Sequence, residues 1–116
     1  MKTDNIIVEK SRLFAIEIVN LYKFLCEEKR EFIMSRQLLR CGTSIGANVK
    51  EGIRGQSKAD FSAKMSIALK EASETEYWLE ILHETYFISD KQYEDINTNC
   101  SELLRILMSI IKSSNS

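Results

Sequence analysis

The 116-residue chain contains no proline, and this absence constrains its fold more than any other feature. Proline lacks a backbone N–H and disrupts helix interiors, so a chain without it is free to form long uninterrupted helices. Average usage would place about six prolines in a chain of this length. Only four glycines occur, all of them from Gly42 to Gly55. The sequence therefore favours an all-helical fold and argues against a turn-rich β-sandwich.

Apolar residues recur at helical spacing in four segments joined by short polar connections. In the last segment they alternate at spacings of three and four residues, which is typical of helices that lie nearly parallel to their neighbours. Helices joined by connections of a few residues pack as antiparallel neighbours. The predicted fold class is all-α, an antiparallel up-down-up-down four-helix bundle in which residues 1–116 form a single domain. The expected helices cover residues 5–28, 31–54, 58–87 and 90–112.

Three glycines fall inside the second expected helix. Gly42, Gly46 and Gly52 each cost roughly 0.8–1.0 kcal/mol relative to alanine in a helix interior. Either a neighbouring helix approaches the backbone closely at these positions, which offsets the cost, or the helix is broken there.

Catalytic and metal-binding motifs are lacking from the sequence. His83 is the only histidine, and Glu80 with His83 forms the only Glu-x-x-His pair, whereas a bundle di-iron site needs two such pairs and two further Glu residues. No phosphate-binding glycine loop and no nucleophile motif occurs. We therefore expect no enzyme activity, no metal and no cofactor.

The cysteine pattern and the hydropathy bear on the compartment. Cys26, Cys41 and Cys100 are odd in number and far apart, which is typical of reduced thiols in cytosolic proteins. No segment reaches the roughly 18 apolar residues that span a membrane. We expect a cytoplasmic protein with no membrane partner.

Basic residues gather on one face of the second expected helix. Residues 29–57 contain six Lys or Arg against two Asp or Glu, whereas residues 58–88 contain three against six. On an ideal helix, five basic side chains lie within roughly 80° of one another, opposite the apolar face. This stripe is a candidate surface for the phosphate backbone of RNA or DNA. The alternatives are a solvated face or ion pairs with an acidic surface. The five residues are Lys29, Arg36, Arg40, Lys50 and Arg54.

The first and third expected helices carry more apolar residues than one bundle core requires. Exposed apolar patches mark interaction surfaces, and tryptophan is enriched at interface hot spots. We therefore predict a homo-oligomer, the alternative being wide core faces on tightly packed helices. The candidate interface residues are Leu13, Ile16, Phe24, Ile67, Trp78, Ile81 and Leu82.

The run of residues 40–52, RCGTSIGANVKEG, resembles the signature of the four helix bundle protein family. This family was described as proteins encoded by intervening sequences in bacterial 23S rRNA genes, and is also labelled the S23 ribosomal protein family. Residues 57–61 and 67–76 strengthen the resemblance, which covers nearly the whole chain. The resemblance implies a four-helix bundle that assembles as a homopentamer. The accessory protein of diversity-generating retroelements, a basic pentameric barrel that binds nucleic acid and a reverse transcriptase, is similar.

No catalytic residue comes with this resemblance. It implies structural polar roles for the motif residues Ser44, Asn48, Glu51, Gly52, Glu71 and Glu76. Because a buried carboxylate needs hydrogen-bond partners, we expect Ser44 and Asn48 to bond across to Glu71 or Glu76 of the third helix. The predicted function is a non-enzymatic homo-oligomeric scaffold, with a pentamer favoured, that binds RNA or DNA through the basic stripe. The alternative is an adaptor that binds another protein and has no nucleic-acid role.

Overall fold

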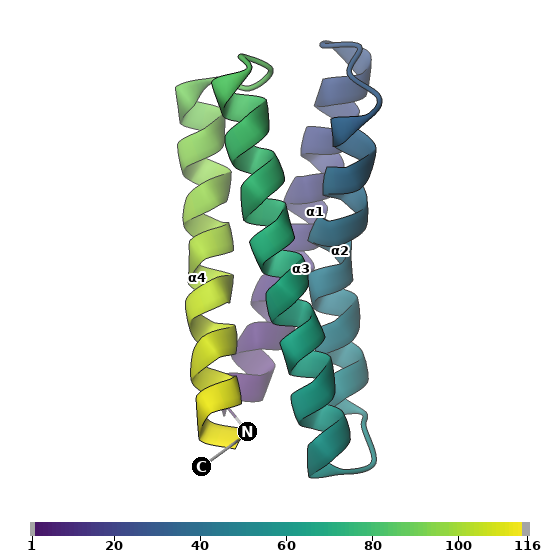
Figure 1. Ribbon diagram of the computed structural model, residues 1–116, viewed down its shortest axis with the longest axis vertical. Coiled ribbons are helices and arrows are strands. Elements are labelled where there is room, and N and C mark those ends of the chain that lie inside the picture. The colour runs from purple at the N-terminus through teal and green to yellow at the C-terminus, as the bar shows by residue number, and fades with distance from the viewer. Residues whose placement is uncertain (1, 115–116) are drawn as a thin grey trace.

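The computed structural model describes the backbone of residues 2–114 and the side chains of residues 6–114. Four long helices make up an elongated bundle with principal extents of 44 × 20 × 19 Å (Figure 1). The helices are α1 (Lys2–Glu27), α2 (Met34–Ile53), α3 (Lys58–Glu84) and α4 (Asp90–Ser114).

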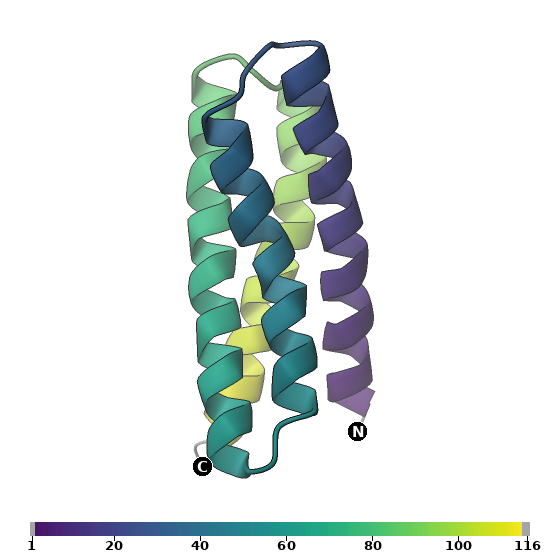
Figure 2. The ribbon, with the colours of Figure 1, turned by 90° about the vertical axis from the view of Figure 1, so that its right-hand side faces the viewer.

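Successive helices run antiparallel and pack side by side (Figures 1 and 2). The backbone of each helix comes close to that of two others, and the backbones of α1 and α3 do not come close to each other within the described residues, so these two helices lie diagonally across the bundle. The contact between α2 and α3 is the most extensive, and that between α1 and α4 is the least. The predicted all-α up-down-up-down bundle is thereby confirmed.

The apolar stripes read from the sequence form the core. On α4 the apolar side chains that alternate at spacings of three and four residues are all buried except Tyr93, which is half-buried. The remaining core positions come from all four helices, as expected for a bundle. The largest fully buried side chains include Phe14, Ile18, Leu25, Leu38, Ile45, Met65, Leu79, Leu82, Leu103 and Leu107.

Glycines on α2 allow α1 to approach its backbone closely. A Cβ atom on Gly42 would lie 2.7 Å from Cγ1 of Ile18, and one on Gly46 would lie 3.3 Å from the carbonyl oxygen of Ser11. The helix continues unbroken through both glycines. Close packing, and not a break in the helix, therefore accounts for these glycines.

The start of α2 differs from the prediction. The carboxylate of Glu31 accepts hydrogen bonds from the backbone N–H groups of Ile33, Met34 and Ser35, at 3.1, 3.0 and 2.7 Å. These groups would otherwise lack partners at a helix N-terminus. Because Glu31 acts from outside the helix, α2 begins at Met34 and not at residue 31. Lys29 consequently lies in the connection between α1 and α2, which corrects its placement on the second helix.

The connection from α3 to α4 is also longer than predicted. α3 ends at Glu84, and Tyr86 adopts a left-handed conformation with φ of 68°. Ser89 and Gln92 form the capping box that starts α4: Ser89 Oγ accepts from the Gln92 N–H at 3.1 Å, and Gln92 Oε1 accepts from the Ser89 N–H at 2.8 Å.

Candidate functional site

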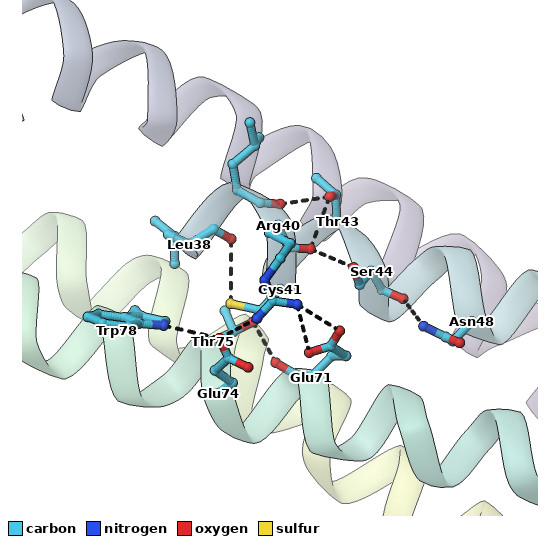
Figure 3. A network of polar contacts seen from close by, with 11 residues as sticks. Leu38, Arg40, Cys41, Thr43, Ser44, Asn48, Glu71, Glu74, Thr75 and Trp78 are labelled. Carbon is cyan, nitrogen blue, oxygen red and sulfur yellow. Dashed lines mark hydrogen bonds and ion pairs between the residues drawn. The ribbon is translucent and has the colours of Figure 1, made fainter. Parts of the chain in front are cut away.

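The segment with the family-like signature lies on α2 and joins α3 through Arg40 (Figure 3). Arg40 Nη1 donates to Glu71 Oε2 at 3.2 Å, and Nη2 donates to Glu74 Oε2. Trp78 Nε1 donates to the same Glu74 oxygen at 3.3 Å. One guanidinium therefore holds two carboxylates of α3, and one of these positions the indole of Trp78.

Both partners of this contact are held in their charged forms. The hydrogen bond from Arg40 lowers the pKa of Glu74, although partial burial opposes the shift. The hydrogen bond to Glu74 raises the pKa of Arg40. The predicted basic stripe is therefore neutralised at its centre by carboxylates of α3.

Ser44 and Asn48 do not make the predicted bonds to α3. Ser44 Oγ donates to the Arg40 carbonyl at 2.6 Å, and Asn48 Nδ2 donates to the Ser44 carbonyl at 2.8 Å. Both bonds lie within α2, because short polar side chains reach the carbonyl one turn earlier on their own helix. The expectation that Ser44 and Asn48 bind Glu71 or Glu76 was wrong.

The other motif residues lie further along the α2–α3 contact or on the far side of α3. Glu51 pairs with Lys64 at 3.1 Å. Gly52 is buried, and a Cβ atom there would lie 3.0 Å from Cβ of Lys64. Glu76 belongs to the side of α3 that faces α4. Burial raises the pKa of Tyr93 on α4, and the charges of Glu80 and Glu76 raise it further.

The five predicted basic residues do not form one continuous stripe. Arg36, Lys50 and Arg54 are exposed, and no hydrogen bond or ion pair engages their side chains among the described residues. Lys29 Nζ lies in the connection, 5.9 Å from the ring centre of Phe24. Arg40, in the middle, is paired. The free cations of α2 are thus divided between its two ends.

The predicted apolar patches are partly exposed. Leu13 and Ile16 on α1 are 48% and 46% exposed, and Ile67 on α3 is 42% exposed. Phe24, Trp78 and Ile81 are half-buried, the first two packed against the core. Leu82 is completely buried, which corrects its assignment to a surface patch. Its position on α3 points inward, with Leu79 one turn earlier.

The side chain of His83 contacts two side chains of α4. Its Nε2 lies 2.7 Å from Asp90 Oδ1, and its ring stacks on Tyr93 with centroids 4.3 Å apart. No cluster of three or more His, Cys, Asp or Glu side chains with metal-binding geometry occurs among the described residues. Within the same part of the chain, none of the helices has the length and hydrophobicity that crossing a membrane requires.

Sequence reasoning missed two carboxylates that matter in the structure. Glu74 shares Arg40 with Glu71, and the three-residue spacing of these glutamates on α3 was the available signal. Glu17 on α1 accepts two hydrogen bonds from Asn99 Nδ2 of α4, at 2.8 and 3.1 Å. Nothing in the local sequence indicates that contact, because it joins residues 82 positions apart.

Comparisons with known proteins agree with this architecture. The sequence profile of the 23S rRNA-intervening sequence protein family matches residues 3–109. The chain is similar to a crystal structure of a protein with unknown function from the S23 ribosomal protein family of Bacteroides thetaiotaomicron. The two share 57% sequence identity and superpose with a TM-score of 0.93, over 95% of this chain and 98% of the other. Among curated proteins, none matches.

Proposed function

The chain belongs to the 23S rRNA-intervening sequence protein family, and we propose that it is a non-enzymatic scaffold that assembles into a homo-oligomer through two different helix faces. The observation that supports this most directly is the placement of exposed apolar residues on diagonal helices. Leu13 and Ile16 lie on α1, and Ile67 lies on α3. Since α1 and α3 lie across the bundle from each other, the two faces belong to opposite sides of the molecule.

Two unlike faces on opposite sides favour a heterologous contact, in which one face of each copy binds the other face of the next. Such contacts generate closed rings when the rotation between copies closes. A pentameric ring is the arrangement that we propose. Half-buried Trp78 and Ile81 extend the α3 face and add the aromatic area that is typical of interface centres.

Introducing a carboxylate on each face tests the proposal. We expect Ile16→Glu and Ile67→Glu each to lower the mass measured by light scattering, because each buries a carboxylate at the contact. Met108→Glu is the matched control, since Met108 is an exposed apolar residue of α4, outside both faces. Circular dichroism should show unchanged helicity in all three variants. A wild-type chain that remains monomeric at micromolar concentration refutes the proposal.

Binding of RNA or DNA is a second candidate function, supported by the unpaired side chains of Arg36, Lys50 and Arg54. Neutralised phosphates release counterions, so affinity falls steeply as salt rises. We expect Lys50→Gln to weaken binding and to lower the slope of log affinity against log salt by about one. Arg40→Gln should leave that slope nearly unchanged, because Arg40 is already paired. If the wild-type chain shows no binding at low salt, an adaptor that binds only proteins is the function that remains.

A further inference from the structure

The seam between α1 and α4 is open toward the end of the bundle that carries the α1–α2 and α3–α4 connections. Toward the other end, Lys10 pairs with Glu102 at 3.2 Å, and in the middle Glu17 bonds to Asn99. From Glu17 to the connections, no hydrogen bond or ion pair joins these helices within the described residues. A groove of about 300 Å³ lies there, lined by Glu17, Asn20, Leu21, Phe24, Gln92, Asp95 and Ile96.

This groove continues into a larger cavity at the end of the bundle. Phe24 and Gln92 line both spaces, and the cavity, of about 740 Å³, extends to Lys29 and Tyr86. On α1 the groove is lined from Glu17 to Phe24, which is about 10 Å of helix at 1.5 Å per residue. That length corresponds to about two turns of a docked helix.

Glu17 gives the groove an uncompensated negative charge. Burial raises the pKa of Glu17, the Asn99 amide opposes that shift, and the charge of Asp95 raises the pKa further. No Lys or Arg side chain pairs with Glu17 in the described part of the chain. The neighbouring Asp95 already has a partner, because Lys91 Nζ lies 3.1 Å from Asp95 Oδ2. A carboxylate beside apolar walls and without a counter-ion is costly unless a cation is supplied.

We propose that the α1/α4 groove is the docking site for an amphipathic helix of a partner protein that places one Lys or Arg side chain against Glu17. Phe24 and Ile96 supply apolar contact for such a helix, in the manner of helix-in-groove recognition. The apolar stem of Lys or Arg packs along such walls while its charged end reaches the carboxylate. The groove borders the α1 face proposed for self-association, because Ile16 precedes Glu17 and Phe24 is also a candidate interface residue. The mass of the homo-oligomer therefore has to be measured beside peptide binding to separate the two proposals.

Two synthetic 18-residue amphipathic peptides test the proposal. Both have a leucine face, and they differ only at the central position of that face, which is Lys in one and Gln in the other. Fluorescence anisotropy with the full chain measures their affinities. We expect the Lys peptide to bind at least tenfold more tightly than the Gln peptide, as for a charge-assisted hydrogen bond. Glu17→Gln should abolish this preference, while Glu94→Gln, which removes an exposed carboxylate of α4, should retain it.

A second variant supplies the cation from within the chain. Asn20→Lys places an ammonium group one turn from Glu17 on α1. We expect it to weaken binding of the Lys peptide about tenfold and to leave the helicity intact. Equal affinity for the two peptides, no binding of either, or an unchanged preference in Glu17→Gln overturns the proposal. A change in the mass of the homo-oligomer on Asn20→Lys also overturns it, because the seam is then a contact between copies of this chain.

Discussion

Gly42 of α2 faces the side chain of Ile18 of α1 so closely that an added Cβ atom would lie within 3 Å of three of its carbons. Ile18 is completely buried and branched at Cβ, so it has few alternative rotamers. The glycine therefore sets the distance between these two helices.

We predict that Gly42→Ala destabilises the protein by about 1–3 kcal/mol, the usual cost of overpacking a core. This loss outweighs the gain of up to about 1 kcal/mol that alanine brings to a helix. Chemical denaturation measures the change. In the double variant with Ile18→Ala, the total loss should be smaller than the sum of the two single losses, because the smaller side chain leaves room for the added methyl group. Gly46→Ala, where the nearest atom is 3.3 Å away, should cost less; an equal or larger cost would contradict the packing explanation.

Trp78 provides a fluorescent report of the Arg40 contact, because it is the only tryptophan. Arg40→Met leaves Glu74 without its cation and loosens the carboxylate that holds the indole. We expect greater quenching of Trp78 by acrylamide and a stability change below about 1 kcal/mol, since exposed ion pairs contribute little. Arg36→Met is the control. Identical quenching in the wild type and Arg40→Met would show that Arg40 does not position Trp78.

Glu31 should make the stability depend on pH. Burial raises the pKa of Glu31, but the hydrogen bonds from the N-terminus of α2 outweigh this effect and lower it below its usual 4.5. The carboxylate therefore stabilises the fold above pH 4.5, and the contribution is lost as pH falls through the lowered pKa. We expect Glu31→Ala to cost about 1 kcal/mol at pH 7.

The cost of Glu31→Ala should shrink as the pH is lowered from 4.5 toward 2.5. Denaturation curves at several pH values measure it, with Glu28→Ala as the control, because Glu28 is exposed and its side chain makes no hydrogen bond or ion pair among the described residues. A cost that stays constant down to pH 2.5 would rule out the capping role.

The three cysteines should differ in reactivity. Burial raises the pKa of Cys100 to about 12, and it also raises that of Cys41. The thiolate is the reactive form, so both should resist alkylation at pH 8 in the folded protein. Cys26 is only half-buried and should react first. Mass spectrometry after iodoacetamide treatment measures this order, and modification of Cys100 before Cys26 would contradict the packing of α4.

The sequence predicted the helices and the core because both follow from local periodicity. The limits of α2 were less predictable, since Glu31 looks like a helix former and acts as a cap. The geometry of an ideal helix likewise placed Arg40 on a basic stripe. It could not show that α3 brings two carboxylates to the Arg40 guanidinium. Leu82 was assigned to a surface because the direction of a side chain depends on how its helix is rotated in the bundle.

The groove beside Glu17 could not be predicted from the sequence. Its walls come from the first and last helices, which are far apart along the chain and meet only in the folded bundle. Its charge becomes significant only because the apolar side chains of Leu21, Phe24 and Ile96 line the same groove. Tertiary arrangement, and not composition, creates that site.

Light scattering on an equimolar mixture of Ile16→Glu and Ile67→Glu tests the proposed assembly most directly. Ile16→Glu keeps an intact α3 face, and Ile67→Glu keeps an intact α1 face. We expect each variant alone to be monomeric and the mixture to form a heterodimer of twice the monomer mass, which cannot grow further. Either variant retaining the wild-type mass, or a mixture that remains monomeric, would contradict a heterologous contact between α1 and α3.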